Sequence, residues 1–158
     1  MFSDSLKLQT MQERQDAKAI LRATRVVVQP STYVLVGLAD SEWKRLIEDP
    51  SLSPRMSAPF MIFRDPHEVT LLLDEIDFGT MWHALRSAKV ERGFRLLTFD
   101  IVMDFSVVGF LATVTTILAE AGVSIVALSS FSRDSILVKQ DDLANVLKAL
   151  GSHVEELC

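Results

Sequence analysis

The stretch DFSVVGFLATVTTILAEAGVSIVALSSFSRDSILVKQDDLANVLKAL, residues 104–150, decides the fold because helical and strand patterns alternate along it. Apolar residues recur every three or four positions over 106–121, which predicts a helix that begins at Ser106 and ends before Gly122. The segment TVTTI inside it favours strand by propensity, but the apolar spacing is helical. Two short apolar runs, 123–128 and 135–138, predict strands, and a last helix is predicted to end at Gly151.

A predicted strand at 94–99 precedes this stretch, and a short closing strand is predicted at 154–157. The resulting order is strand, helix, strand, strand, helix, strand, which is the ferredoxin-like order. The first half repeats it, with strands expected at 26–28, 33–38, 60–63 and 69–73 and helices at 40–47 and 74–87. When 65 is added to the residue numbers of 60–85, the hydrophobic pattern of this segment matches that of 125–150, which indicates an internal repeat. Few residues are identical, so the alternative explanation is a chance match of the two patterns.

We therefore predict an α+β protein with two tandem βαββαβ units, antiparallel sheets and helices on one face. The expected divisions are an N-terminal extension over 1–24, a first unit over 25–92 and a second unit over 93–158. The extension is expected to be loosely docked and helical over 6–21, or to be a disordered tail. Units of this size bury small cores, so they should dock on each other.

Composition excludes several classes of protein. Of 158 residues, 49% are hydrophobic and 23% charged, so a folded core is expected, and the net charge of −5 argues against binding to nucleic acid. No apolar run approaches the ~20 residues of a membrane span, and no secretory signal is expected at the N-terminus, which favours a cytoplasmic protein. The single cysteine, Cys158, excludes an intramolecular disulfide and a cysteine-based zinc site.

The second half resembles the C-terminal ACT domain of the CASTOR-like tandem ACT-domain protein family. The similarity is carried by Asp104-Phe105-Ser106, Gly109, Ala121-Gly122, Ile136-Leu137-Val138-Lys139 and Asp142-Leu143, and more weakly by the first half through Arg64-Asp65-Pro66 and residues 90–95. The resemblance implies a tandem ACT protein that binds an amino acid or a related metabolite and acts as a regulatory sensor. A homodimer is expected because apolar sheet edges are normally covered, and no cofactor or metal is expected.

ACT domains bind their ligands mainly with the loop between the first strand and the first helix, and with the neighbouring strand. The resemblance therefore implies a ligand site at Asp104, Phe105, Ser106, Val107, Val108, Gly109, Ser129, Ser130 and Phe131. Arg64 is added because its segment, 64–67, matches 129–132 in the repeat; the alternative is a proline turn with solvated charges. A helix N-terminus presents free N–H groups that hold a carboxylate, and Gly109 in the first turn would let a ligand approach. The alternative is that Asp104 or Ser106 only caps the helix and Gly109 only packs. The run Ser129–Ser135 lacks the two tyrosines of the family, so the resemblance does not identify the ligand.

Two other functions remain open from the sequence. A small biosynthetic-pathway enzyme could have recruited the fold, with a substrate pocket at the interface of the two ACT units and Asp104, Asp134 or His67 as an acid or base. A pure interaction subunit would bind no ligand at all. No nucleotide-binding or nucleophile motif is present, and the three histidines lack metal-ligand spacing. Trp43, Trp82 and the nine phenylalanines are expected in the core.

Overall fold

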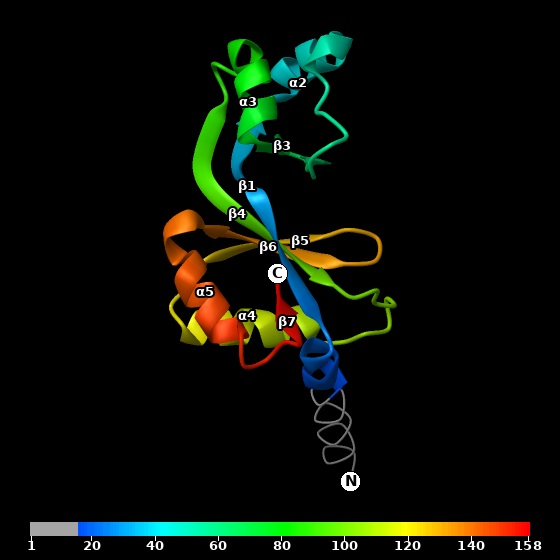
Figure 1. Cartoon of the computed structure of the whole chain (residues 1–158). Helices are drawn as coiled ribbons and strands as arrows, with labels where there is room; N and C mark the ends of the chain where they lie inside the picture. Colours follow the sequence, from blue (N-terminus) through cyan, green and yellow to red (C-terminus); the bar gives the residue numbers. More distant parts are fainter. Residues whose placement is uncertain (1–15) are drawn as a thin grey trace. The chain divides into compact units, whose positions relative to one another are not determined.

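The computed structural model describes residues 16–158, which form two compact units (Figure 1). One unit comprises Pro30–Phe94, and the other comprises Arg95–Cys158 together with the described residues before Pro30. The sequence prediction instead divides the chain at residues 24 and 92. The difference concerns Arg25–Gln29, which belongs to the unit formed by the second half of the chain.

The unit Pro30–Phe94 contains the elements expected of a βαββαβ fold. Strand β1 (Arg25–Leu38) leads to helix α2 (Asp40–Ile47), and the hairpin of β2 (Met61–Arg64) and β3 (Val69–Asp74) follows. Helix α3 (Glu75–Met81) and a 3-10 turn (Trp82–Ala84) lead to β4 (Lys89–Asp100). The strand order is β2-β3-β1-β4, so the first strand lies between the third and the fourth.

The other unit has the same order but a different source for its fourth strand. Its hairpin consists of β5 (Ile125–Ser129) and β6 (Asp134–Lys139), and its helices are α4 (Phe110–Glu120) and α5 (Leu143–Leu150). The strand order is β1-β4-β6-β5. The place of the fourth strand beside β4 is thus filled by Arg25–Gln29 of β1, from the N-terminal side of the chain.

The closing strand predicted at 154–157 is present but short. Strand β7 (Glu156–Leu157) pairs in parallel with the start of β1, where Arg25 lies opposite Glu156 and Val26 opposite Leu157. It therefore extends the sheet beyond the N-terminal segment instead of lying beside β4. Both units are ferredoxin-like, as the order of elements in the sequence predicts.

The repeat predicted from the hydrophobic pattern extends to the hydrogen-bonded register. In one hairpin Met61 lies opposite Leu72, and in the other Val126 lies opposite Leu137, each number being larger by 65. Strands β3 and β6 have bounds that differ by the same amount. Because a register slip of one residue would turn every side chain to the other face, this agreement reflects one architecture in both halves.

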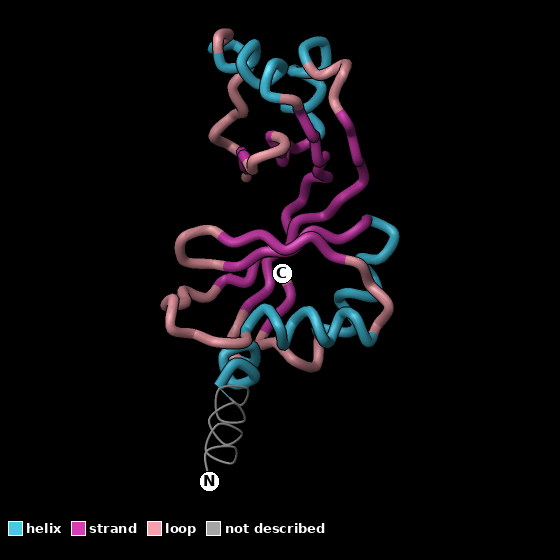
Figure 2. Tube along the Cα trace, turned by 180° about the vertical axis from the view of Figure 1, so that it is seen from behind, coloured by secondary structure: helices cyan, strands magenta, loops and turns pink. Residues whose placement is uncertain are grey.

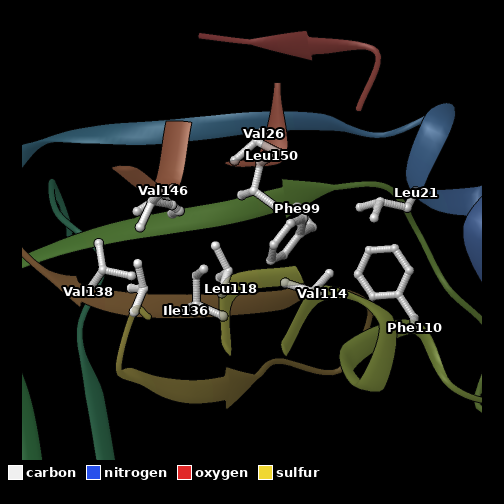
Figure 3. Close-up of a cluster of buried hydrophobic side chains, with 12 residues drawn as sticks. Leu21, Val26, Phe99, Phe110, Val114, Leu118, Ile136, Val138, Val146 and Leu150 are labelled. Carbon is white, nitrogen blue, oxygen red and sulfur yellow. The ribbon is translucent and has the colours of Figure 1, made fainter. Parts of the chain in front are cut away.

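The core of the unit Arg95–Cys158 lies between its strands and helices α4 and α5, which cover one face of the strands (Figures 2 and 3). Phe99 of β4 and Ile136 of β6 face Val114 and Leu118 of α4, and the rings of Phe99 and Phe110 meet edge to face with centroids 5.4 Å apart. Burying side chains of this size stabilises the fold by about 1.5–3 kcal/mol each.

Residues 16–22 are helical and belong to this core, which corrects the expectation of a loosely docked extension. Ala17 is fully buried and Leu21 is 1% exposed, and Leu21 packs in the same cluster as Phe110 (Figure 3). The part of the predicted helix before residue 16 lies outside the described residues. The sequence predicts the helix but not its burial, because only a few residues of this segment are apolar.

The two strands expected at 26–28 and 33–38 are one continuous strand, contrary to the prediction. Strand β1 continues from Arg25 to Leu38 through Pro30, which is exposed and lies where the two units divide the chain. The fixed φ of proline is compatible with extended backbone, and its missing N–H is tolerated where no ladder bond is required.

Candidate functional site

One pocket of the unit Arg95–Cys158 brings together the two segments that the sequence singles out. It has a volume of about 340 Å³ and lies between the β4–α4 loop and the β5–β6 hairpin. Eight residues proposed from the sequence as ligand-binding or catalytic line it: Asp104, Phe105, Val107, Gly109, Ser129, Ser130, Phe131 and Asp134. The two segments are tied to each other, because the N–H of Met103 donates to the carbonyl of Ser132 at 3.0 Å.

The β4–α4 loop owes its shape to Asp104. Its Oδ1 accepts the N–H of Ser106 at 2.8 Å, and its carbonyl accepts the N–H of Val107 at 3.0 Å. This is the local turn that aspartate side chains favour. The backbone hydrogen bond from Ser106 lowers the pKa of the Asp104 carboxyl, and a hydrogen bond from the Ser106 hydroxyl lowers it further. Asp104 therefore presents a negative charge at one side of the pocket.

Helix α4 begins four residues later than predicted, and Gly109 explains why. Gly109 is the N-cap residue and has φ +83°, a left-handed conformation that cannot continue a right-handed helix. The expectation that Gly109 lies inside the first turn is thus wrong. Neither Asp104 nor Ser106 caps α4, and the Gly109 carbonyl accepts the N–H and the hydroxyl of Thr113, each at 2.9 Å.

The first turn of α4 provides hydrogen-bond donors at the pocket. Phe110, Leu111 and Ala112 all line it, and among the residues that the structure describes their N–H groups have no acceptor. The first N–H groups of a helix lack partners inside it and carry about half a positive charge in total. An anionic group of a ligand is the natural partner for such donors.

The opposite wall is a polar hairpin held by its own hydrogen bonds. Ser129 Oγ lies 2.6 Å from Asp134 Oδ1, and the N–H of Ser130 donates to the carbonyl of Arg133 at 2.8 Å. The Nε of Arg133 pairs with Asp100 Oδ1 at 2.9 Å, and both side chains are about 40% exposed. A half-exposed guanidinium with further N–H donors therefore stands at the edge of the pocket.

Two exposed aromatic rings, one from each of the two segments that line the pocket, touch each other. Phe105 from the loop is 79% exposed and Phe131 from the hairpin 82% exposed, and their centroids are 5.3 Å apart at an interplanar angle of 84°. The expectation that all phenylalanines and Trp82 lie in the core is wrong, since Trp82 is 45% exposed as well. The polar neighbours of Phe105 and Phe131 in predicted turns are the only sequence signal for this exposure.

Four candidate residues lie outside this pocket. Arg64 and His67 belong to the unit Pro30–Phe94, where the Nη2 of Arg64 pairs with Asp40 Oδ2 at 3.0 Å. Ser106 shapes the loop without lining the pocket, and Val108 lines a different pocket beside α4. Of the three groups considered as an acid or base, Asp104 and Asp134 line the pocket and His67 does not.

Neither a metal cluster nor a membrane helix is found in the described part of the chain. Within residues 16–158, no three His, Cys, Asp or Glu side chains gather as metal ligands would. None of the helices described is both long and apolar enough to cross a membrane.

The fold is the ferredoxin-like ACT fold. A family model for the ACT domain matches residues 89–152, which include β4, the pocket and the β5–β6 hairpin. The match begins at the first residue of β4 and ends just after α5. No curated protein sequence matches the chain significantly.

Solved structures of low sequence identity share this fold. A protein from Agobacterium tumefaciens is 19% identical with a TM-score of 0.68, covering 86% of this chain and 92% of its own. A Vibrio cholerae protein of unknown function, described as a possible transport protein, is 23% identical with a TM-score of 0.62, covering 90% and 97%. The regulatory subunit of aspartate kinase from Thermus thermophilus, in ligand-free form, is 15% identical with a TM-score of 0.57, covering 80% and 96%.

Proposed function

We propose that this chain is a non-catalytic regulatory protein with two ACT-type units that binds an amino acid or a related small metabolite. The observation that carries the proposal is the pocket in which the first-turn N–H groups of α4, the Asp104 carboxylate and the Phe105–Phe131 pair meet. The ACT match and the shared fold support a ligand-binding regulatory role. The identity of the ligand rests on the chemistry of the pocket alone.

An α-amino acid has complementary groups for each part of the pocket. Its carboxylate suits the N–H groups of Phe110, Leu111 and Ala112, where the helix dipole favours negative charge. Its ammonium group suits the carboxylate of Asp104, and an apolar side chain suits the exposed rings. Pockets of this kind bind through apolar contact and take their specificity from a few polar groups.

Thermal shift and calorimetry with the twenty amino acids test the proposal directly. We expect saturable binding of at least one amino acid with an apolar side chain. Asp104→Asn keeps an oxygen that accepts the Ser106 N–H but removes the charge, so it should weaken that binding about tenfold or more without loss of fold.

Asp65→Asn is the matched control for this substitution. Asp65 makes the same type of turn in the other unit, because its Oδ1 accepts the N–H groups of His67 at 2.7 Å and Glu68 at 2.8 Å. The control should bind like the parent protein. If no amino acid binds, or if both variants bind equally well, the pocket is not an amino-acid site.

We also propose that the protein is a cytoplasmic homodimer. Strands β2 and β5 end the strand orders of their respective units, and Phe63 on β2 is 57% exposed. Exposed apolar edge strands are commonly covered by another chain. Light scattering at micromolar concentration should give twice the chain mass of 17.6 kDa, and a concentration-independent monomer would contradict the dimer.

A further inference from the structure

A second pocket lies beside α4 and contains none of the β5–β6 hairpin residues that line the first. Its volume is about 520 Å³, and it is lined by the helix at 16–22, by Val108 and Gly109, by α4 and by His153. All of these residues belong to one unit. Gly109 and Ala112 line both pockets, but Asp104, Phe105 and Phe131 do not line this one, so its side chains differ from those of the function proposed above.

Positive charge gathers at one wall of this pocket. Lys18 and Arg22 stand four residues apart on the same helix, both are exposed and both line the pocket. Within residues 16–158 neither forms an ion pair, although Glu120 also lines the pocket. Like charges at this spacing repel, and an anion between them would relieve the repulsion.

Apart from Thr113, Thr116, Glu120 and His153, the rest of the lining is apolar. Leu21, Val108, Ala112 and Ile117 supply carbon surface, and Val108 is 55% exposed. The apolar lining positions on α4, Ala112 and Ile117, lie roughly 8 Å apart along the helix axis, and Val108 adds apolar surface from the preceding loop. The occupant that fits is therefore elongated and apolar over much of its length.

The threonines in the β-favouring segment TVTTI complete this wall. Thr113 and Thr116 line the pocket, and their hydroxyls donate to the carbonyls of Gly109 at 2.9 Å and Ala112 at 2.7 Å. Threonine is a poorer helix former than alanine, so these residues do not serve the stability of α4. Because their hydroxyl protons are engaged, the threonines do not compete for an anion with Lys18 and Arg22, the two cationic side chains of the lining.

We infer that the pocket between helix 16–22 and α4 binds an amphipathic monocarboxylate, a small acid with an extended hydrocarbon chain. The carboxylate of the ligand pairs with Lys18 and Arg22, and its hydrocarbon chain lies along the wall formed by Val108 and Ile117. The charge complementarity selects an acid over a neutral molecule, and the length of the apolar wall selects a chain over a compact ion.

Calorimetry on the full chain with octanoate as the probe tests this inference. We expect saturable binding of octanoate, with acetate and octanol each at least tenfold weaker. Acetate lacks the chain and octanol lacks the charge, so the two comparisons separate the two parts of the site. Equal binding of octanoate and acetate, or of octanoate and octanol, would overturn the inference.

Variants locate the carboxylate and the chain. Lys18→Gln with Arg22→Gln should weaken octanoate binding at least tenfold, and Lys44→Gln with Lys148→Gln, which makes the same charge change at exposed positions outside the pocket, should not. Val108→Ser should reduce the preference for octanoate over acetate. If both double variants lose binding equally, the attraction is only one of net charge and the inference fails.

Amide chemical shifts provide a readout that does not depend on any variant. Octanoate should shift the amide signals of Thr116, Ile117 and His153. Shifts confined to Phe105 and Phe131 would place octanoate in the pocket of the β5–β6 hairpin and would overturn the inference.

Discussion

The rings of Phe105 and Phe131 meet edge to face with centroids 5.3 Å apart, although each side chain is about four-fifths exposed. Aromatic pairs in this geometry contribute about 0.5–1.5 kcal/mol beyond the area that they bury. The pair joins the β4–α4 loop to the β5–β6 hairpin and leaves apolar surface facing solvent. Apolar surface that faces solvent does not stabilise the fold, but it could contact the apolar part of the ligand proposed above.

Replacing Phe131 should therefore affect binding more than stability. We expect Phe131→Ala to lower the free energy of unfolding by no more than about 1 kcal/mol, because so little of the ring is buried. The affinity for an apolar amino acid should fall about tenfold, or about 1.4 kcal/mol. Calorimetry and thermal melts measure both quantities.

Phe63→Ala makes the same change on an exposed strand of the other unit, where Phe63 is 57% exposed. It should leave the affinity unchanged. A Phe131→Ala protein that binds like the parent, or a Phe63→Ala protein that loses binding, would exclude the aromatic pair from the ligand site.

Gly109 and Gly79 should respond in opposite directions to the same substitution. Gly109→Ala forces a Cβ into the left-handed region at φ +83° and should lower the free energy of unfolding by about 1–2 kcal/mol. Strain is the cause, since the nearest atom to the added Cβ, that of Ala17, is 4.0 Å away. Gly79→Ala inside α3 meets no atom within 4 Å and should stabilise by about 0.5–1 kcal/mol. Denaturant unfolding distinguishes the two signs, and stabilisation by Gly109→Ala would contradict the N-cap conformation.

The hairpins could be predicted from the sequence because local patterns determine them. Residues 69–73 and 135–138 are continuous apolar runs of strand length beside turn residues, and both hairpins have the register that the shift by 65 implies. The two segments that line the candidate pocket could be predicted from these apolar patterns together with the ACT resemblance. Its two walls are adjacent because β4, β6 and β5 are neighbours in the sheet.

Other features depend on long-range contacts that no local pattern records. Arg25–Gln29 fills the fourth strand position of a unit that is otherwise made from the second half of the chain. The start of α4 at Phe110 could not be predicted, because it depends on the positive φ of Gly109. A glycine within a helical pattern does not by itself indicate a positive φ. Arg64 was assigned to the site by its place in the repeat, whereas its partner in the structure is Asp40.

The carboxyl of Asp104 should titrate at a lower pH than an ordinary aspartate. The Ser106 N–H is the main cause of its lowered pKa and the Ser106 hydroxyl the second. Because the folded pKa lies below the unfolded value of about 3.9, the stabilisation is complete above that value and is lost as the pH falls through the folded pKa. NMR titration should show the lowered pKa in the native protein. Ser106→Ala should reduce the shift without abolishing it, and an unshifted Asp104 in the parent would contradict the turn.

The final prediction concerns Arg55, which holds two buried carboxylates of the unit Pro30–Phe94. Its Nε lies 2.6 Å from Asp77 Oδ1 and its Nη2 lies 2.6 Å from Asp74 Oδ2, and the two aspartate side chains are 4% and 2% exposed. Arg55→Met leaves both charges buried without a counter-ion, so we expect the free energy of unfolding to fall by about 2–3 kcal/mol. This value is below that of a fully buried pair, because the Arg55 side chain is 43% exposed. Arg64→Met removes the exposed pair with Asp40 and should cost less than about 1 kcal/mol, as surface pairs do. Chemical denaturation compares the two variants, and equal losses would show that the buried position of Asp74 and Asp77 gives Arg55 no special role.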